Sequence, residues 1–417
     1  MKKIFIITIF TLIIAVLGIY FIFIFPKNSN KKKKEEKIVY TDALKDTNVV
    51  LDNEAIVEFG RIKHLSDFLS LTTGTLNDEE IIYDDLGEVT VNFSYNLDKK
   101  KQYRFVKFNI VDTTKPYISV PSIKTISVNT GIDFIYDFFC ADNHDRNVER
   151  YLEGDFEIGK VGSYYVKYVA KDSSGNISDK EMTLNIVENI PKSSGNSSSS
   201  SHINYLDYQD LYNQYKTENT KIGIDISRWQ GDVDFAKLKE NNVEFIMIRL
   251  GGQEGVDGEY YIDSKFERNM EEAKKYGFAV GVYFYSYAYT EEEAINQAKY
   301  VIDNLKGYDL KLPIVFDWEC WNKFNKLNVS LYDITKVQNA YLDYVSKKGY
   351  KAARYGSKNA LVYEWQDSHH LTWLAHYISE TNYEGEYFMW QRCDTGRVAG
   401  INGAVDVDIL YLDKFDL

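Results

Sequence analysis

The chain has 417 residues, which is enough for about two to four domains. Hydrophobic residues make up 44% of it, so a sizeable core is possible and wholesale disorder is excluded. The formal net charge of −13 argues against a nucleic-acid partner, because no basic surface would neutralise phosphates. Three cysteines and six histidines stand at no metal-ligand spacing, so we predict no disulfide framework, no structural metal and no cofactor.

The first residues predict a membrane anchor. Residues 4–25 form an apolar run without a charge, which Lys2 and Lys3 precede and Pro26 closes. At a rise of about 1.5 Å per residue, such a helix crosses a hydrocarbon core of about 30 Å. Because no small-residue cleavage site follows, we predict an uncleaved transmembrane signal-anchor over residues 1–26 and a basic juxtamembrane segment over residues 27–37.

Residues 38–189 have the pattern of an all-β region. Stretches such as 89–95 alternate with period two, and turn residues such as 172–176 separate them. An internal repeat divides the region into two β-sandwich modules, residues 38–113 and 114–189. Each module begins its repeat with a short Gly-containing motif, continues with two strands and ends with an Asn-Ile-Val motif. The two motifs lie at residues 86–89 and 109–112 in the first module, and at residues 158–161 and 185–188 in the second.

Four short motifs relate the second module to a known family. They are Asp112-Thr113-Thr114-Lys115-Pro116, Ala141-Asp142, Gly162-Ser163-Tyr164-Tyr165-Val166 and Asp172-Ser173-Ser174-Gly175-Asn176. On these motifs the module resembles bacterial immunoglobulin-like domains of cell-surface proteins, and the first module matches less closely. Such modules bind a cell wall or serve as spacers. A Ser-rich linker, residues 190–202, follows them.

Residues 203–417 change to apolar strands that alternate with amphipathic helices. We expect strands at 222–226, 245–250, 278–285, 312–316, 351–355, 371–375, 387–391 and 404–409, and helices at 234–241, 264–276, 291–305 and 331–347. Buried strands that alternate with helices predict a parallel α/β barrel, shortened where the helices fade near its end. Such barrels place their chemistry at the carboxyl ends of the strands.

Four acidic residues interrupt or follow these apolar strands: Asp225, Asp317, Glu319 and Asp406. Residues two apart in a strand point to the same side, so Asp317 and Glu319 both face the barrel mouth or both face away. Two carboxylates so close cannot both ionise freely, and a raised acid beside an ionised partner suits glycosidic cleavage. The alternative is a solvated or salt-bridged pair at a strand end, and spacing alone does not decide between them.

Six motifs in order resolve this choice. They are 223–231 (GIDISRWQG), 281–286 (GVYFYS), 316–319 (FDWE), 373–377 (WLAHY), 390–391 (WQ) and 400–406 (GINGAVD). With them, residues 221–417 resemble glycoside hydrolase family 25, the lysozymes that cleave the β-1,4 bond after N-acetylmuramic acid. The resemblance implies a shortened barrel of five β/α units followed by three strands.

Residue roles follow from the same resemblance. It implies Glu319 as the general acid and Asp317 as the group that assists the substrate's 2-acetamido group, in a substrate-assisted route with retention. Asp225 and Asp406 would line the pocket. Tyr283 and Tyr377 would contact the sugars, and Trp373, Trp229 and Trp390 would stack on sugar faces. Buried barrel core is the alternative for each of these tryptophans.

Together these features predict a peptidoglycan hydrolase, an N-acetylmuramidase, that cleaves between N-acetylmuramic acid and N-acetylglucosamine. A non-catalytic wall-binding lectin would lack Asp317 or Glu319, and a chitinase would carry a longer Asp-rich motif. We expect a single-pass protein of the cell membrane with its catalytic domain facing the cell wall. The lysines at 27 and 31–34 outnumber those before the anchor and favour the opposite orientation, but the substrate lies outside the cell. The sequence predicts no oligomeric state.

Overall fold

A computed structural model describes residues 38–190, except 136, and residues 204–417, except 306. The predicted signal-anchor, the basic segment and all but the first residue of the region 190–202 lie outside the described residues. In the described ranges, no helix combines the length and the apolar character that a membrane crossing needs.

The chain divides into two compact units, and the smaller one is all-β. Its described residues are 38–51, 69–77 and 90–106. One sheet has the strand order β1-β7-β6-β5, and β2 pairs with β4 in a second. The hairpin between β6 and β7 turns at Asp98 and Lys99, whose φ angles of 49° and 64° suit a tight two-residue turn. The strands are β1 (Thr41–Asp42), β2 (Val49–Leu51), β4 (Leu69–Leu71), β5 (Thr75–Leu76), β6 (Gly87–Leu97) and β7 (Lys100–Val111).

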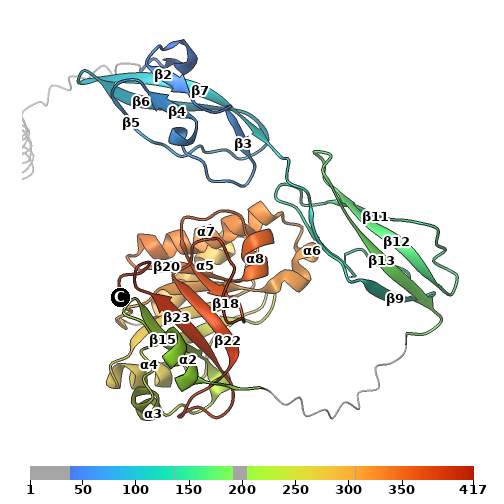
Figure 1. The fold of residues 1–417 in the computed structure, drawn as a ribbon, viewed down its shortest axis with the longest axis vertical. Helices are drawn as coiled ribbons and strands as arrows, with labels where there is room; N and C mark the ends of the chain where they lie inside the picture. Colours follow the sequence, from blue (N-terminus) through green and yellow to red (C-terminus); the bar gives the residue numbers. More distant parts are fainter. Residues whose placement is uncertain (1–37, 136, 191–203, 306) are drawn as a thin grey trace, which may run out of the picture. The chain divides into compact units, whose positions relative to one another are not determined.

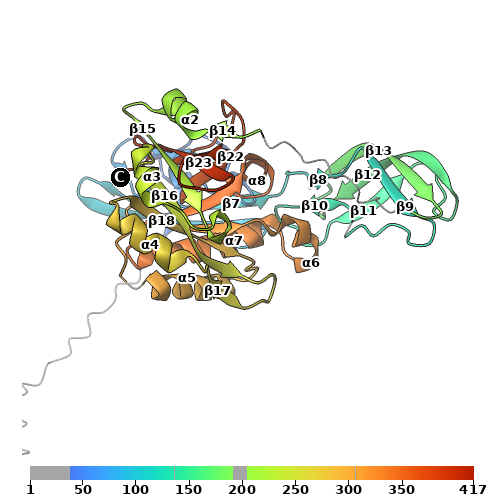
Figure 2. The ribbon, with the colours of Figure 1, turned by 90° about the horizontal axis from the view of Figure 1, so that it is seen from below.

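The larger unit comprises residues 52–68, 78–89 and 107–417, and it contains the second β-module. A four-stranded sheet, β11-β12-β13-β9, and a two-stranded sheet, β10-β8, share one apolar core (Figures 1 and 2). The strands are β8 (Tyr117–Ser119), β9 (Ile123–Ser127), β10 (Phe139–Ala141), β11 (Glu149–Glu153), β12 (Gly162–Lys171) and β13 (Ile177–Val187). The prediction of an all-β region is therefore confirmed.

The internal repeat has a structural counterpart in the strand pairing. In the first module β3 (Ile56–Glu58) runs parallel to the second strand of the β6–β7 hairpin, and β5 runs antiparallel to the first. In the second module β9 runs parallel to β13, and β11 runs antiparallel to β12. In both modules the first strand of a long hairpin thus has an antiparallel neighbour, and the second strand pairs in parallel, with β1 and β3 in the first module and with β9 in the second.

The C-terminal part is a closed barrel of eight strands, as predicted. Its strands are β15 (Thr220–Ile226), β16 (Phe245–Gln253), β18 (Ala279–Ser286), β19 (Ile314–Trp318), β20 (Ala352–Ser357), β21 (Leu371–Ala375), β22 (Met389–Arg397) and β23 (Val405–Tyr411). Strands β15 to β22 pair in parallel in this order. Two shorter strands extend the sheet: β14 (Leu206–Asp207) beside β22 and β17 (Tyr260–Ile262) beside β16.

The last strand corrects the prediction of a wholly parallel barrel. Strand β23 pairs antiparallel with both β22 and β15. Only residues 398–404 connect it to β22. A parallel crossover needs a dozen or more residues, so this short connection can only turn back.

Five helices alternate with the first five barrel strands and lie outside the ring of strands (Figure 1). They are α3 (Phe235–Glu240), α4 (Phe266–Lys275), α5 (Glu291–Leu305), α7 (Leu331–Lys347) and α8 (Lys358–Tyr363). Helix α7 begins with a capping box, in which Asp333 N–H donates to Ser330 Oγ at 3.1 Å and Ser330 N–H donates to Asp333 Oδ2 at 2.9 Å. Helix α2 (Tyr208–Tyr215) precedes the barrel, and α6 (Phe324–Leu327) follows β19.

The strands separate two apolar layers. One face of each strand packs against the helices, and the other fills the lumen with large side chains such as Phe245, Met247 and Trp373. Gly223 makes room for this filling, because a Cβ at its position would lie 2.6 Å from the ring of Phe245. Below the mouth, the lumen is therefore a packed core.

This packing predicts that Gly223→Ala destabilises the barrel by about 1–3 kcal/mol, because the added methyl group overpacks a rigid core. Thermal unfolding checks this, with Gly159→Ala as control, since a Cβ at Gly159 meets nothing within 4 Å. An equal unfolding temperature for the two variants would contradict the packing described here.

Candidate active site

The structure brings the four predicted acidic residues together at one mouth of the barrel. Asp225 lies near the end of β15, and Asp317 lies near the end of β19 with Glu319 just beyond it. Because β23 is antiparallel, its first residues lie at this same mouth, and Asp406 pairs in register with Asp225. Charge interactions link Asp317 to Asp225 and to Glu319, and link Asp406 to Asp225 and to Glu319.

The acids differ in their access to solvent. Asp225 and Asp317 are each 6% exposed, whereas Asp406 is half-buried and Glu319 is exposed. Glu319 lines a groove together with Tyr355, Ala375, His376, Tyr377 and Tyr383, among others. A ligand in this groove would reach Glu319 first, with Asp317 directly beneath it.

Burial changes the proton affinity of all four acids. It raises the pKa of Asp225 and Asp317 well above the ordinary value, and the neighbouring Glu319 raises that of Asp317 further. Burial also raises the pKa of Glu319, because the concave mouth displaces water although the side chain stays accessible. For Asp406, burial and then Asp225 raise the pKa to about 9. At the mouth, burial therefore favours the uncharged, protonated form of these acids.

One oxygen in this cluster has no internal partner. Asp317 Oδ1 is buried and accepts no hydrogen bond. A buried acceptor without a donor costs free energy, about 1–3 kcal/mol in typical cases. An N–H group of a bound ligand would satisfy it.

A network that the sequence did not predict holds Asp225. Gln391 Nε2 donates to Asp225 Oδ2 at 2.7 Å. The hydroxyls of Tyr355 and Tyr377 donate to Gln391 Oε1 at 2.8 and 2.9 Å, and Tyr283 hydrogen-bonds to Asp225. The Trp-Gln motif at 390–391 was the sequence signal for this role of Gln391. A polar residue between buried neighbours in a strand indicates that its side chain has a hydrogen-bond partner.

Two further charged groups were missed in the sequence. Arg249 interrupts an apolar strand, and its Nε and Nη2 donate to Asp263 Oδ2 at 2.8 and 2.6 Å. Asp408 is fully buried, with Oδ1 accepting from Trp373 Nε1 at 2.9 Å and Oδ2 without a partner. A charge inside an apolar strand was the available signal for both residues.

The tryptophans divide into core and surface. Trp373 and Trp390 are only 2% and 3% exposed, and Trp390 Nε1 donates to the backbone oxygen of His376 at 2.8 Å. Neither ring presents a face to a sugar, so the alternative of barrel core describes both. Trp229 is 73% exposed in a short helical turn after β15, and the guanidinium of Arg228 lies 5.0 Å from its ring centre.

The comparison with known families now decides the class of this site. The description "Glycosyl hydrolases family 25" matches residues 224–401. These residues form a family 25 glycosyl hydrolase domain. The match spans the strands that carry Asp225, Asp317 and Glu319, and the predicted resemblance is confirmed for this region.

Similar proteins agree with this class. An autolytic lysozyme of Clostridium acetobutylicum is 29% identical over 193 residues, 45% of this chain and 54% of its own length. Lysozyme M1 of Streptomyces globisporus is 25% identical over 206 residues, 44% of this chain and 65% of its own length. The chain thus spans about half the length of the clostridial relative. The C-terminal region is a lysozyme-type glycoside hydrolase domain.

Among solved structures, the modular autolysin LytC of Streptococcus pneumoniae, in complex with a synthetic peptidoglycan ligand, is 28% identical to this chain. The alignment covers 59% of this chain and 56% of that one, with a TM-score of 0.42.

The buried acids predict that the free energy of unfolding of the family 25 domain depends on pH. Burial raises the pKa of Asp408 in the folded state, so the folded state holds a proton that the unfolded state releases above about pH 4. Stability from this group is present at low pH and falls as the pH rises. Asp408→Asn should therefore raise the free energy of unfolding at pH 8 by about 1 kcal/mol or more, and by less at pH 5.

Chemical denaturation at the two pH values measures this difference. Asp413→Asn is the control, because Asp413 is exposed. A destabilised Asp408→Asn variant at pH 8 would show that the charge has a compensating partner.

Proposed function

We propose that this protein is a peptidoglycan hydrolase that cleaves the β-1,4 bond between N-acetylmuramic acid and N-acetylglucosamine. The observation that carries the proposal is the interacting pair of acids Asp317 and Glu319 at the barrel mouth, in which a buried oxygen of Asp317 has no hydrogen-bond donor. The family match and the lysozyme relatives support the substrate class.

Glu319 acts as the general acid in this proposal. Burial raises the pKa of its carboxyl group, which favours the protonated form that donates, and its exposed position lets it reach the glycosidic oxygen. It transfers its proton to that oxygen while the bond from the anomeric carbon to the oxygen breaks. The resulting carboxylate later takes a proton from the water that attacks the anomeric carbon.

Asp317 assists the substrate's own nucleophile. Its free oxygen accepts the N–H of the 2-acetamido group, which orients the acetamido oxygen toward the anomeric carbon. That oxygen forms a bond to the carbon as the leaving group departs, and a carboxylate beside the ring stabilises the positive charge of the cyclic intermediate. Water then opens the intermediate, so the configuration is retained.

The remaining polar residues shape the pocket. Asp225, held by Gln391, and Asp406 line the pocket beneath the reacting ring. Tyr283 and Tyr377 present hydroxyl groups near the same carboxylates. No metal enters any step.

The rest of the chain positions this domain. We propose that residues 1–26 anchor it in the cell membrane as a single pass, with the catalytic domain on the cell-wall side. The two all-β modules are proposed as immunoglobulin-like spacers that carry the domain away from the bilayer.

Glu319→Gln tests the assignment of the acid. The amide keeps the shape of the side chain but cannot donate the catalytic proton, so turnover of purified peptidoglycan should fall by about 10²–10⁴-fold. Mass spectrometry of the products should show N-acetylmuramic acid at the new reducing ends for the unaltered chain.

The control for this test is Glu384→Gln, which changes another acid lining the same groove and should retain activity. If the unaltered chain binds peptidoglycan and leaves the glycan strands intact, the protein is a wall-binding lectin. Near-normal turnover by Glu319→Gln would remove this residue from the mechanism.

Trp229 provides a separate prediction about substrate binding. Its exposed ring can stack on a sugar face, so Trp229→Ala should raise KM several-fold and change kcat less, because stacking acts on bound sugar throughout the reaction. Trp229→Phe keeps a ring and should recover most of the loss. If Trp229→Ala lowers kcat without raising KM, and Trp229→Phe does not recover activity, the ring does not stack on bound sugar.

A further inference from the structure

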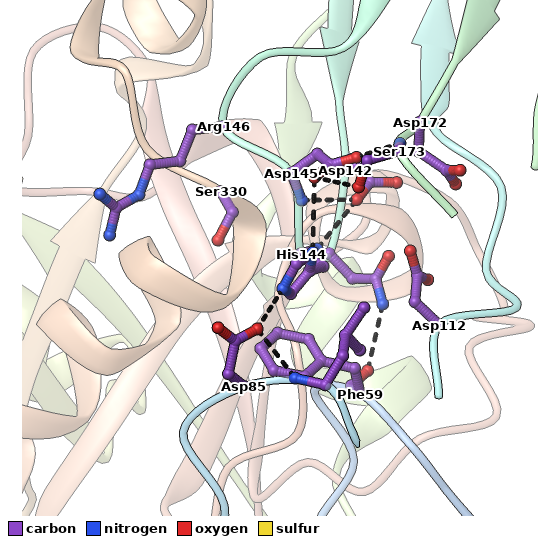
Figure 3. A network of polar contacts seen from close by, with 12 residues as sticks. Phe59, Asp85, Asp112, Asp142, His144, Asp145, Arg146, Asp172, Ser173 and Ser330 are labelled. Atoms are coloured by element: carbon purple, nitrogen blue, oxygen red, sulfur yellow. Dashed lines mark hydrogen bonds and ion pairs between the residues drawn. The ribbon is translucent and has the colours of Figure 1, made fainter. Parts of the chain in front are cut away.

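A second cluster of carboxylates lies in the β-module, far along the sequence from the active site. Asp112 follows the last residue of β7, Asp142 follows β10, and Asp172 follows β12. Each offers one oxygen, and these oxygens all lie within 4.8 Å of one another. The three residues are 7%, 1% and 4% exposed, and Figure 3 shows them beside one another.

The hydrogen bonds orient these carboxylates but leave oxygens free. Asp142 Oδ1 accepts from the backbone N–H of His144 and Asp145 at 2.9 and 2.8 Å, and Asp112 Oδ1 accepts from Thr114 N–H at 3.2 Å. The second oxygen of Asp142 is buried without a partner. Asp112 also hydrogen-bonds to the side chains of Asn143 and Ser174, and both oxygens of Asp172 accept from Asn176 at 2.8 Å. In the described part of the chain, no Lys or Arg forms an ion pair with the three carboxylates.

An independent neutral group adds a further free oxygen. Asn143 is 1% exposed, and its Oδ1 has no hydrogen-bond partner. Its Nδ2 donates to the backbone oxygen of Phe59 at 3.2 Å, so the amide oxygen is directed away from Phe59. The side chain of Asn143 also contacts the carboxylate of Asp112. The cluster therefore combines buried carboxylates with a buried, neutral amide group.

We propose that Asp112, Asp142, Asp172 and Asn143 bind one Ca²⁺ ion. All the ligand atoms are oxygens, which favours a hard cation over zinc or copper. The Ca–O distance of 2.3–2.6 Å makes a ligand shell about 4.6–5.2 Å across, which can hold three carboxylate oxygens that lie within 4.8 Å of one another. A Mg²⁺ shell is smaller, about 4.0–4.2 Å across.

Charge supports the same conclusion. Without a cation, three carboxylates lie together in a low-dielectric site, where like charges repel strongly. Burial and the neighbouring Asp112 and Asp172 raise the pKa of Asp142 to about 7. A divalent ion removes this repulsion and satisfies the unpartnered oxygens together. Bound water would complete the six to eight ligands that Ca²⁺ takes.

The ion would also stiffen the larger unit. The backbone oxygens of Asp142 and Asn143 accept the N–H groups of Leu331 and Tyr332, at 2.8 and 3.2 Å, at the start of helix α7. His144, next in sequence, pairs with Asp85 at 2.8 Å (Figure 3). Ca²⁺ at the side chains would therefore fix the loop whose backbone contacts the hydrolase domain. This role differs from the sequence prediction of no structural metal, which considered only cysteine and histidine.

Calorimetric titration of the full chain with CaCl₂, in mild detergent and after EGTA treatment, tests the site. We expect saturable binding of one ion. Asp142→Asn should weaken it by about a hundredfold or abolish it, because the ligand charge is lost. The asparagine oxygen still accepts from His144 and Asp145, so the loop should keep its shape. Asp155→Asn, an exposed change in the same module, is the matched control and should bind as the unaltered chain does.

A second measurement needs no variant. The thermal unfolding temperature of the unaltered chain should rise when Ca²⁺ replaces EGTA, and Mg²⁺ at the same concentration should not reproduce the rise. Absence of calcium-dependent heat, equal affinity in Asp142→Asn, or equal binding of Mg²⁺ would each overturn the assignment. Peptidoglycan turnover is measured separately, so failure of the hydrolase proposal leaves this test unaffected.

Discussion

Strand β23 closes the barrel by pairing with β15 on one side and β22 on the other, and the hydrolase site depends on this closure. The antiparallel direction of β23 brings Asp406 opposite Asp225 and places Asp408 opposite both Gly223 and Gln391. A parallel strand in this position would carry the same residues to the opposite mouth. The short connection from β22 therefore determines which acids share the site, because it is too short for a crossover.

Burial in the closed lumen raises the free energy of a negatively charged group, and little positive charge lies there to offset it. The buried Arg249 forms its ion pair with Asp263. Desolvation consequently raises the pKa of the carboxyl groups, and the role proposed for Glu319 as general acid needs the protonated form that this shift favours. The stability lost at the mouth is compensated by the apolar core below it, where Phe245, Met247 and Trp373 fill the lumen.

The two carboxylate clusters of this protein are both buried groups of like charge, but they differ in their access to solvent. At the barrel mouth, Glu319 is exposed, so the cluster can exchange protons and admit a ligand. In the β-module, Asp142 and Asn143 are almost fully enclosed, and backbone N–H groups orient the carboxylate of Asp142. Such a site suits a permanent ion, because an enclosed set of oxygens binds a cation and excludes larger ligands.

Periodicity alone located several elements. The sequence predicted α5, α7 and β21 with their observed bounds, since a strong helical period and an apolar strand are local signals. The six ordered motifs likewise identified the four acids and the enzyme class. Strand β17, helix α8 and the extension of β16 to Gln253 were missed, because they form only when distant partners are present.

The amino-acid sequence by itself thus determined the all-β and barrel regions and the acids of the mouth, because these depend on residue type and spacing. The tertiary structure alone decided the direction of β23, the support of Asp225 by Gln391 and the burial of Trp373 and Trp390. It also decided the meeting of Asp112, Asp142 and Asp172, which 60 residues of chain separate. Each of these depends on which strand ends meet in space, and a linear pattern carries no such information.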